Sequence, residues 1–294
     1  MERADGILRM LKINYASSQD DIQEFSWKPS LKIFTFLTDD EAAALATNTR
    51  KVLQFMVTDK DNPNSVLNIV TQARENGRSV QDHITKEMWQ CLNDFYHTIR
   101  QEKLIDQLER QDPITVLDTL IKQGLLYYGT TDVTMARGEG NSFINIGKLL
   151  ERAIQSADIL DIKFNDLNYE LEKPADTTYW KYLLMSISGY ELYLKTYRSG
   201  FGAKNVMEQI ILNENFPRSI IYSVIHMHKY FHRLKNDNGG FGKIEFMMGK
   251  LESKIKFSTP DTIIQEGLHH FLSETKAALF QIGNTLNESY FAHG

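Results

Sequence analysis

The longest amphipathic pattern in the chain runs from residue 143 to residue 167. Its apolar residues recur every three or four positions, which is the spacing of one face of an α-helix. They are Phe143, Ile146, Leu150, Ala153, Ala157, Leu160, Phe164 and Leu167. The pattern predicts one long helix whose apolar face packs into a core. Glu151 and Arg152 point about 100° apart on this helix, so they do not pair with each other and each needs another partner.

The Glu-Arg-Ala stretch of this helix occurs twice in the chain. Residues 2–4 match residues 151–153, and the apolar positions that follow match as well. A second match joins residues 52–70 to residues 206–224 without a gap, with a proline and a serine at equivalent places. Trp27 likewise corresponds to Trp180. A single match of about 150 residues across nearly the whole chain indicates gene duplication with pseudo-two-fold packing, in contrast to the short periods of solenoids.

The other patterns are helical too, so the sequence predicts an all-α protein. Helices are expected at residues 1–16, 27–36, 38–58 and 88–108. Further helices are expected from the turn that contains Pro63 to about residue 76, and after Pro113 and Pro260. Thr38 with Glu41 has the spacing of a capping box, and Gly77 is expected to break or kink its helix.

We expect two tandem repeats, residues 1–138 and 139–294, each of about five helices, that form a pseudo-two-fold helical bundle. If the two Glu-Arg helices lay side by side about a local two-fold axis, Glu2 would meet Arg152, and Glu151 would meet Arg3.

Composition limits the classes of function. The chain has 294 residues, of which 42% are hydrophobic and 24% charged, as in ordinary globular proteins. A net charge of -5 gives no electrostatic reason to bind nucleic acid or an acidic membrane, and no apolar run is long enough to span one. The sole cysteine, Cys91, excludes an internal disulfide and a cysteine-rich zinc site. The amphipathic N-terminus does not resemble a signal peptide, so we expect a cytoplasmic protein.

Several motifs together resemble the bacterial Alpha-E family, a helical domain named for its Glu-Arg motif. They are both Glu-Arg-Ala stretches, residues 73–94 (ARENGRSVQDHITKEMWQCLND), NPNSV at 62–66, FPRSI at 216–220 and MARGEGNSF at 135–143. Members of that family commonly have a further segment ahead of the first Glu-Arg. We therefore expect that the first helix is cut short at Met1.

The resemblance implies a partner function. Alpha-E proteins are similar in genomic setting to companions of ATP-grasp-like and transglutaminase-like proteins, in predicted peptide or amide-modification systems. We expect a non-catalytic partner or scaffold protein of such a system. The alternative is an enzyme or small-ligand-binding protein that uses a charged Glu/Arg pocket between the repeats, with Glu2 or Glu151 as general base. Neighbouring arginines lower a carboxylate pKa, which argues against such a base.

The candidate binding residues are the two Glu-Arg pairs and the arginines expected near them. They are Glu2, Arg3, Arg78, Arg137, Glu151, Arg152 and Arg218. One interpretation is a salt-bridge network that fixes helix packing; a second is a charged pocket for a polar or anionic ligand or partner; the third is a solvated face. No catalytic residue is assigned.

Metal and cofactor signals are weak. Glu266 and His269 have the Glu-x-x-His step of di-iron bundles, but no second copy occupies the equivalent place. His228 and His232 share a helix face, yet lack the adjacent glutamate of the metalloprotease motif. Cys91 lies beside apolar residues and is expected to be packed. We therefore expect no metal and no cofactor.

Overall fold

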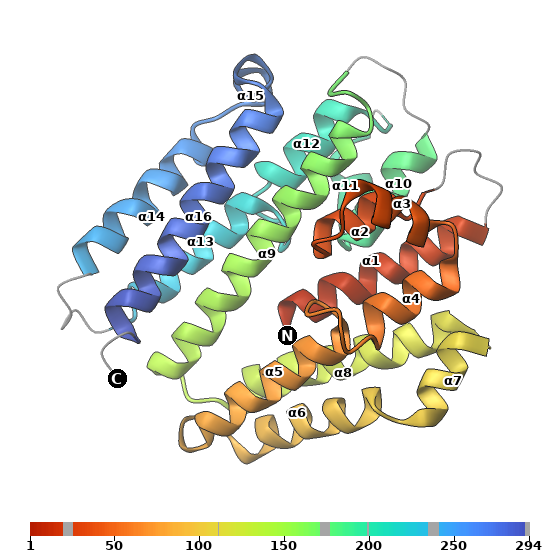
Figure 1. The fold of residues 1–294 in the computed structure, drawn as a ribbon. Coiled ribbons are helices and arrows are strands. Elements are labelled where there is room, and N and C mark those ends of the chain that lie inside the picture. The colour runs from red at the N-terminus through yellow and green to blue at the C-terminus, as the bar shows by residue number, and fades with distance from the viewer. Residues whose placement is uncertain (20–25, 111, 171–176, 199, 235–240, 292–294) are drawn as a thin grey trace. The chain divides into compact units, whose positions relative to one another are not determined.

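The computed structural model describes residues 1–19, 26–110, 112–170, 177–198, 200–234 and 241–291. In these residues the regular structure consists of sixteen α-helices and one short 3-10 helix, without a strand (Figure 1). The prediction of an all-α protein is therefore confirmed. The chain divides into two compact units, Met1–Ala136 and Arg137–Gly294. Every helix in the described part of the chain is too short or too polar to cross a lipid bilayer.

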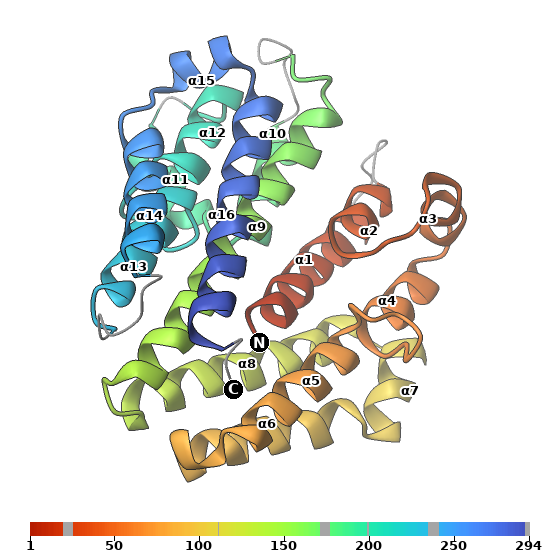
Figure 2. The same cartoon turned by 60° about the vertical axis from the view of Figure 1, so that its left-hand side comes forward.

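Unit 1 is built around four helices that pack on one another, α1, α5, α6 and α8 (Figure 2). Its elements are α1 (Glu2–Gln19), α2 (Lys28–Phe34), α3 (Asp39–Ala46), α4 (Thr49–Val57), α5 (Val66–Ser79), η1 (Gln81–His83), α6 (Lys86–Ile99), α7 (Glu102–Arg110) and α8 (Pro113–Thr134). α8 lies against both α1 and α6, and α5 lies against α6. Their apolar faces form the core, in which Ile7, Leu11 and Leu117 are fully buried.

Unit 1 has more helices than expected. The capping box of Thr38 and Glu41 is present, with the Thr38 amide donating to Glu41 Oε2 at 2.8 Å. The expected helix 38–58 is two helices, because the Asn48 side chain accepts from the Lys51 amide and caps a new start. The expected helix 88–108 also divides, into α6 and α7. Each unit thus has eight α-helices among the described residues, more than the five expected.

Gly77 does not end its helix as expected. α5 continues through it to Ser79. A Cβ at Gly77 would lie 2.6 Å from Cδ1 of Leu92 on α6. The glycine is therefore explained by the close approach of two helices, because a Cβ at this position would force the Leu92 side chain to shift.

Unit 2 is organised around α9, which packs against α13, α16 and α12. Its helices are α9 (Glu139–Asn165), α10 (Thr177–Ser186), α11 (Tyr190–Thr196), α12 (Ala203–Ile211), α13 (Ile220–Phe231), α14 (Phe241–Lys256), α15 (Pro260–Glu266) and α16 (Leu268–Tyr290). α14 lies on the other side of α13 and α16 and contacts both (Figure 1).

The long helix predicted at residues 143–167 is α9, with 27 residues. Its buried face differs slightly from the expected one. Leu149 is buried, whereas Leu150 is half-buried and lies against α16, where a Cβ at Gly283 would meet its Cδ2 at 3.0 Å. Leu167 lies beyond the end of the helix at Asn165.

Candidate functional site

In unit 1 the Glu-Arg motif opens α1. Glu2 is only 4% exposed, and its Oε2 accepts a hydrogen bond from the Tyr128 hydroxyl on α8 at 2.6 Å. Arg3 is exposed, and its Nη1 donates to Oδ1 of Asn64 at 3.3 Å. Asn64 immediately precedes Ser65, the N-cap of α5. The motif therefore ties the start of α1 to α8 and to the turn before α5.

In unit 2 the Glu-Arg motif lies in the middle of α9, and both side chains are half-buried. Arg152 Nη1 donates to the Pro217 carbonyl oxygen at 3.2 Å. Glu151 Oε1 accepts from Gln155 Nε2 one turn later on the same helix, at 2.9 Å. Pro217 lies in the turn before α13, so the arginine joins α9 to that turn.

The other three candidate arginines are placed differently from one another. The carbonyl oxygen of half-buried Arg218 accepts from Ser156 Oγ of α9 at 2.7 Å, which adds a second tie to the turn before α13. Arg78, whose side chain is 66% exposed, pairs with Glu75 at 3.4 Å near the C-terminal end of α5. That end is about 20 Å from the turn that Arg3 contacts. Arg137 is exposed in the segment that joins α8 to α9.

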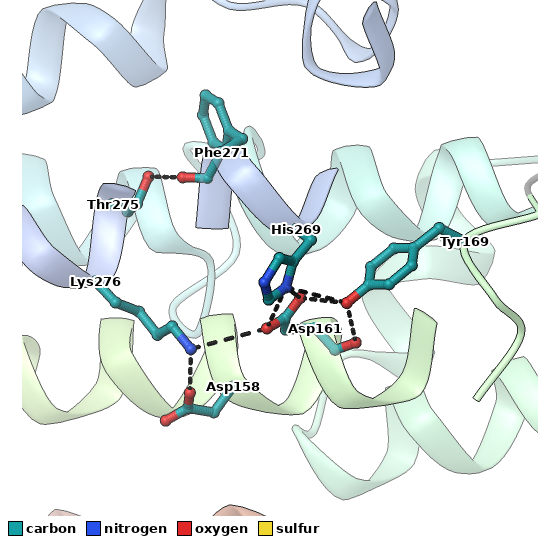
Figure 3. Close-up of polar contacts among 7 residues, drawn as sticks. All are labelled: Asp158, Asp161, Tyr169, His269, Phe271, Thr275 and Lys276. Carbon is teal, nitrogen blue, oxygen red and sulfur yellow. Dashed lines mark hydrogen bonds and ion pairs between the residues drawn. The ribbon is translucent and has the colours of Figure 1, made fainter. Parts of the chain in front are cut away.

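A denser polar cluster lies within unit 2, between α9 and α16 (Figure 3). Asp161 of α9 is buried, and its two carboxylate oxygens lie 2.9 and 3.1 Å from Nδ1 of His269, in the first turn of α16. The Tyr169 hydroxyl donates to Asp161 Oδ1 at 2.8 Å. Lys276 is 2.8 Å from Asp158 and 3.8 Å from Asp161. Three side chains therefore converge on one buried carboxylate.

The backbone contributes to this arrangement. Asn168 and Tyr169 both have positive φ, 52° and 57°, which is costly for a tyrosine. This left-handed turn after α9 returns the Tyr169 ring to Asp161. Burial, followed by the hydrogen bond and the charge of Asp161, raises the pKa of the Tyr169 hydroxyl, so it stays protonated and donating. Burial also raises the pKa of Asp158, against the opposing effect of Lys276.

The geometry is that of an aspartate-oriented histidine. Both contacts of His269 with Asp161 use Nδ1, and its side chain is 64% exposed, so Nε2 lies on the side away from the carboxylate. An imidazole held in this way has a fixed orientation, and its other nitrogen can make a hydrogen bond elsewhere. The cluster therefore presents one imidazole nitrogen, with a fixed direction, as a hydrogen-bonding atom for a group at the surface.

The Glu-x-x-His step does not assemble. Glu266 pairs with Lys254 at 3.1 Å, whereas His269 turns to Asp161. Cys91 is buried, as expected, and its Sγ donates to the Thr130 hydroxyl at 3.4 Å.

Residues 1–291 match a family described as a predicted α-helical domain with a conserved ER motif, Alpha-E. The chain belongs to the Alpha-E family. The match covers essentially the whole chain, so both units lie inside the family domain. Neither the curated proteins nor the solved structures contain a match to this Alpha-E chain.

The motif that gives Alpha-E its description was found from the sequence, but the Asp161–His269 pair was not. The one available signal was Asp161 itself, a carboxylate directly after an apolar stripe residue in a helix expected to be buried. Its partner lies more than a hundred residues away in the sequence. Spacing within a helix gives no information on a contact of that kind.

Proposed function

We propose that this Alpha-E chain is a non-catalytic partner or scaffold protein of an ATP-grasp-like or transglutaminase-like enzyme that modifies peptides or amides, in the bacterial cytoplasm. The observation that carries the scaffold role is the use of both Glu-Arg motifs for internal contacts. Arg3 contacts Asn64 and Arg152 contacts Pro217, each in the turn before a core helix of its own unit. The class of enzyme partner comes from the family resemblance.

The two motifs also support tandem repeats. The sequence match pairs Pro63 with Pro217 and Ser65 with Ser219. Both serines are fully buried and cap a helix, by accepting from the amide three residues later. We propose that a duplicated unit kept the same clasp, in which an arginine of the first or central helix holds the turn before the next core helix.

The alternative, an enzyme that uses Glu2 or Glu151 as general base, has less support. A general base has to reach a substrate proton. Glu2 is buried and accepts from Tyr128, and Glu151 accepts from Gln155. Each carboxylate thus serves a contact inside its own unit.

The test uses three purified proteins: this chain, an ATP-grasp-like protein and a transglutaminase-like protein from the same genome. Size-exclusion chromatography with light scattering measures complex formation, and a mass-spectrometric assay measures amide-bond formation or cleavage. We expect a stable complex with one of the two enzymes, a change in that enzyme's rate, and no turnover by this chain alone. Turnover by this chain alone, or no complex with either enzyme, would overturn the proposal.

The clasp itself is tested by the double variant Arg3→Met, Arg152→Met, with Arg110→Met as the matched control. Arg110 is exposed and pairs with the exposed Asp106, so its loss changes stability by less than about 0.5 kcal/mol. The double variant should melt at a lower temperature and lose the complex, because the clasped turns loosen. A double variant with wild-type melting that loses only the complex would show that the arginines contact the partner directly.

A further inference from the structure

Two histidines and two glutamates lie together where α13 meets α14, away from the Asp161 cluster. His228 lies in the last turn of α13 and His232 is the C-cap residue one turn later; their rings stack with centroids 4.6 Å apart. Glu245 and Glu252 are two turns apart on α14. The Nε2 atoms of both histidines lie 3.3 Å from the same oxygen, Oε1 of Glu245. The ligand atoms of these three residues all lie within 4.8 Å of one another.

These distances suit a metal better than hydrogen bonds. A charge-assisted N–H···O contact is normally 2.7–2.9 Å long, so both 3.3 Å contacts are long. Zinc bonds to histidine and carboxylate are about 2.0–2.1 Å, which makes each edge of a tetrahedral site about 3.3–3.4 Å. The two contacts to Glu245 thus have the length of two edges of such a tetrahedron.

Two atoms of the cluster also lack a hydrogen bond. Nε2 of His228 and Oε2 of Glu245 are buried, and neither has a hydrogen-bond partner in the part of the chain that the structure describes. A buried polar atom without a partner is unfavourable. A cation bound to Nε2 of His228 and to the Glu245 carboxylate would give both groups a partner.

A second contact fixes the histidine in a metal-binding form. Nδ1 of His228 lies 2.8 Å from Oε2 of Glu252. In metal sites a carboxylate commonly accepts from the other ring nitrogen, which sets the tautomer and leaves Nε2 as the ligand. His228 therefore has both the ligand atom and the orienting partner that such sites use.

We propose that His228, His232 and Glu245 bind one Zn²⁺, that Glu252 orients His228, and that the fourth position is open. His228, His232 and Glu252 line a surface groove of about 410 Å³, together with Lys229, Gly249 and Ser253. Two histidines and one glutamate with an open fourth position are the donor set of catalytic zinc sites. A water or an anionic group of a ligand would take that position from the groove.

The other half of the chain supports a cation at this place. The offset of 154 residues that pairs Pro63 with Pro217 places Arg74 opposite His228. In unit 1 the Arg74 guanidinium lies over the rings of Trp89 and Tyr96 and donates to Asn93 on α6. Unit 1 therefore carries its own cation, the Arg74 guanidinium, between α5 and α6. In unit 2 the residue at this offset is a histidine beside two carboxylates of α14, and a bound cation would supply the positive charge that Arg74 supplies in unit 1.

A third group of residues provides an internal control. Glu266, His270 and Glu274 also lie within metal-ligand range of one another. However, Lys254 contacts Glu266 at 3.1 Å and Glu274 at 2.5 Å. An ammonium already balances these carboxylates, so we expect no metal there.

The test measures zinc bound to the full chain after treatment with a chelator, reloading with ZnCl₂ and desalting. Mass spectrometry of the metal should give one zinc per chain at micromolar protein. Co²⁺ in its place should give the intense visible bands of a tetrahedral site. The variants His232→Gln and Glu245→Gln should lose the stoichiometric metal, and Glu252→Gln should bind about 10- to 100-fold more weakly.

The matched controls are His226→Gln, on the same helix with its ring stacked on Tyr222, and His270→Gln, in the cluster held by Lys254. Both should keep one zinc per chain. Circular dichroism of each variant without metal should equal that of the wild type, which separates loss of a ligand from loss of the fold. The proposal would be overturned if the wild-type chain retained no zinc. It would also be overturned if the control variants lost the zinc while His232→Gln and Glu245→Gln kept it.

Discussion

Replacing Ser156 by alanine removes a hydroxyl that joins α9 to the turn before α13. Ser156 is 3% exposed, and its Oγ donates to the Arg218 carbonyl oxygen at 2.7 Å. Removal of one partner from a buried hydrogen bond costs about 1–3 kcal/mol, and one lost oxygen adds little cavity. In a unit of this size each kcal/mol lowers the melting temperature by about 2–4 °C. A loss of about 2 kcal/mol should therefore lower the melting of unit 2 by about 4–8 °C.

Differential scanning calorimetry measures this change, and Ser223→Ala is the matched control. Ser223 is fully buried, and its Oγ donates to the Ser219 carbonyl oxygen, which also accepts from the Ser223 amide. Its loss leaves that carbonyl with a partner, so the control should change the melting temperature by no more than about 2 °C. Equal decreases in the two variants would refute the view that α9 is tied to this turn through Ser156.

Two further predictions concern a close approach and a helix cap. Gly189→Ala should lower the free energy of unfolding by about 1–3 kcal/mol, because its Cβ would lie 2.7 Å from Cζ of the buried Phe216 ring. Gly77→Ala should lower it by less, because the atom that its Cβ meets is the end of a flexible leucine side chain. Equal urea midpoints for the two variants would contradict this. The Thr115 hydroxyl holds the pKa of Asp112 below 3.8 in the folded state, so the cap stabilises the fold above that pH and weakens as the pH falls. Urea unfolding measures the difference in unfolding free energy between the wild type and Asp112→Asn. This difference should favour the wild type more at pH 6 than at pH 3; a difference that does not change with pH would contradict the assignment.

The sequence predicted the features that arise within single helices. The period of apolar residues gave α9, the proline and serine turns gave the starts of α5 and α13, and Thr38 with Glu41 gave a real capping box. It overestimated helix length at residues 38–58 and 88–108, because the apolar period continues across Asn48 and Gln101 although the helix is interrupted there. Local periodicity detects a face, and a polar cap of one residue hardly changes it.

The candidate sites depended on contacts between distant helices, and these were harder to predict. The His228–His232 spacing was visible in the sequence, but a metal site needs a third ligand, and Glu245 comes from the next helix. The Glu266–His269 spacing was equally visible, yet its residues take different partners. Two residues on one helix face share a direction; whether they share a ligand depends on what the neighbouring helix places opposite them.

The central position of α9 has a consequence for how unit 2 opens. α9 is about 40 Å long, and α12, α13 and α16 all pack against it. α14, by contrast, packs against α13 and α16 on their outer side. Detachment of α14 leaves the α9 contacts intact, whereas a break in α9 separates three helices at once. The four long helices of the unit should therefore open from the edge inward, with α14 as the first of the four to exchange its amide hydrogens and α9 as the last.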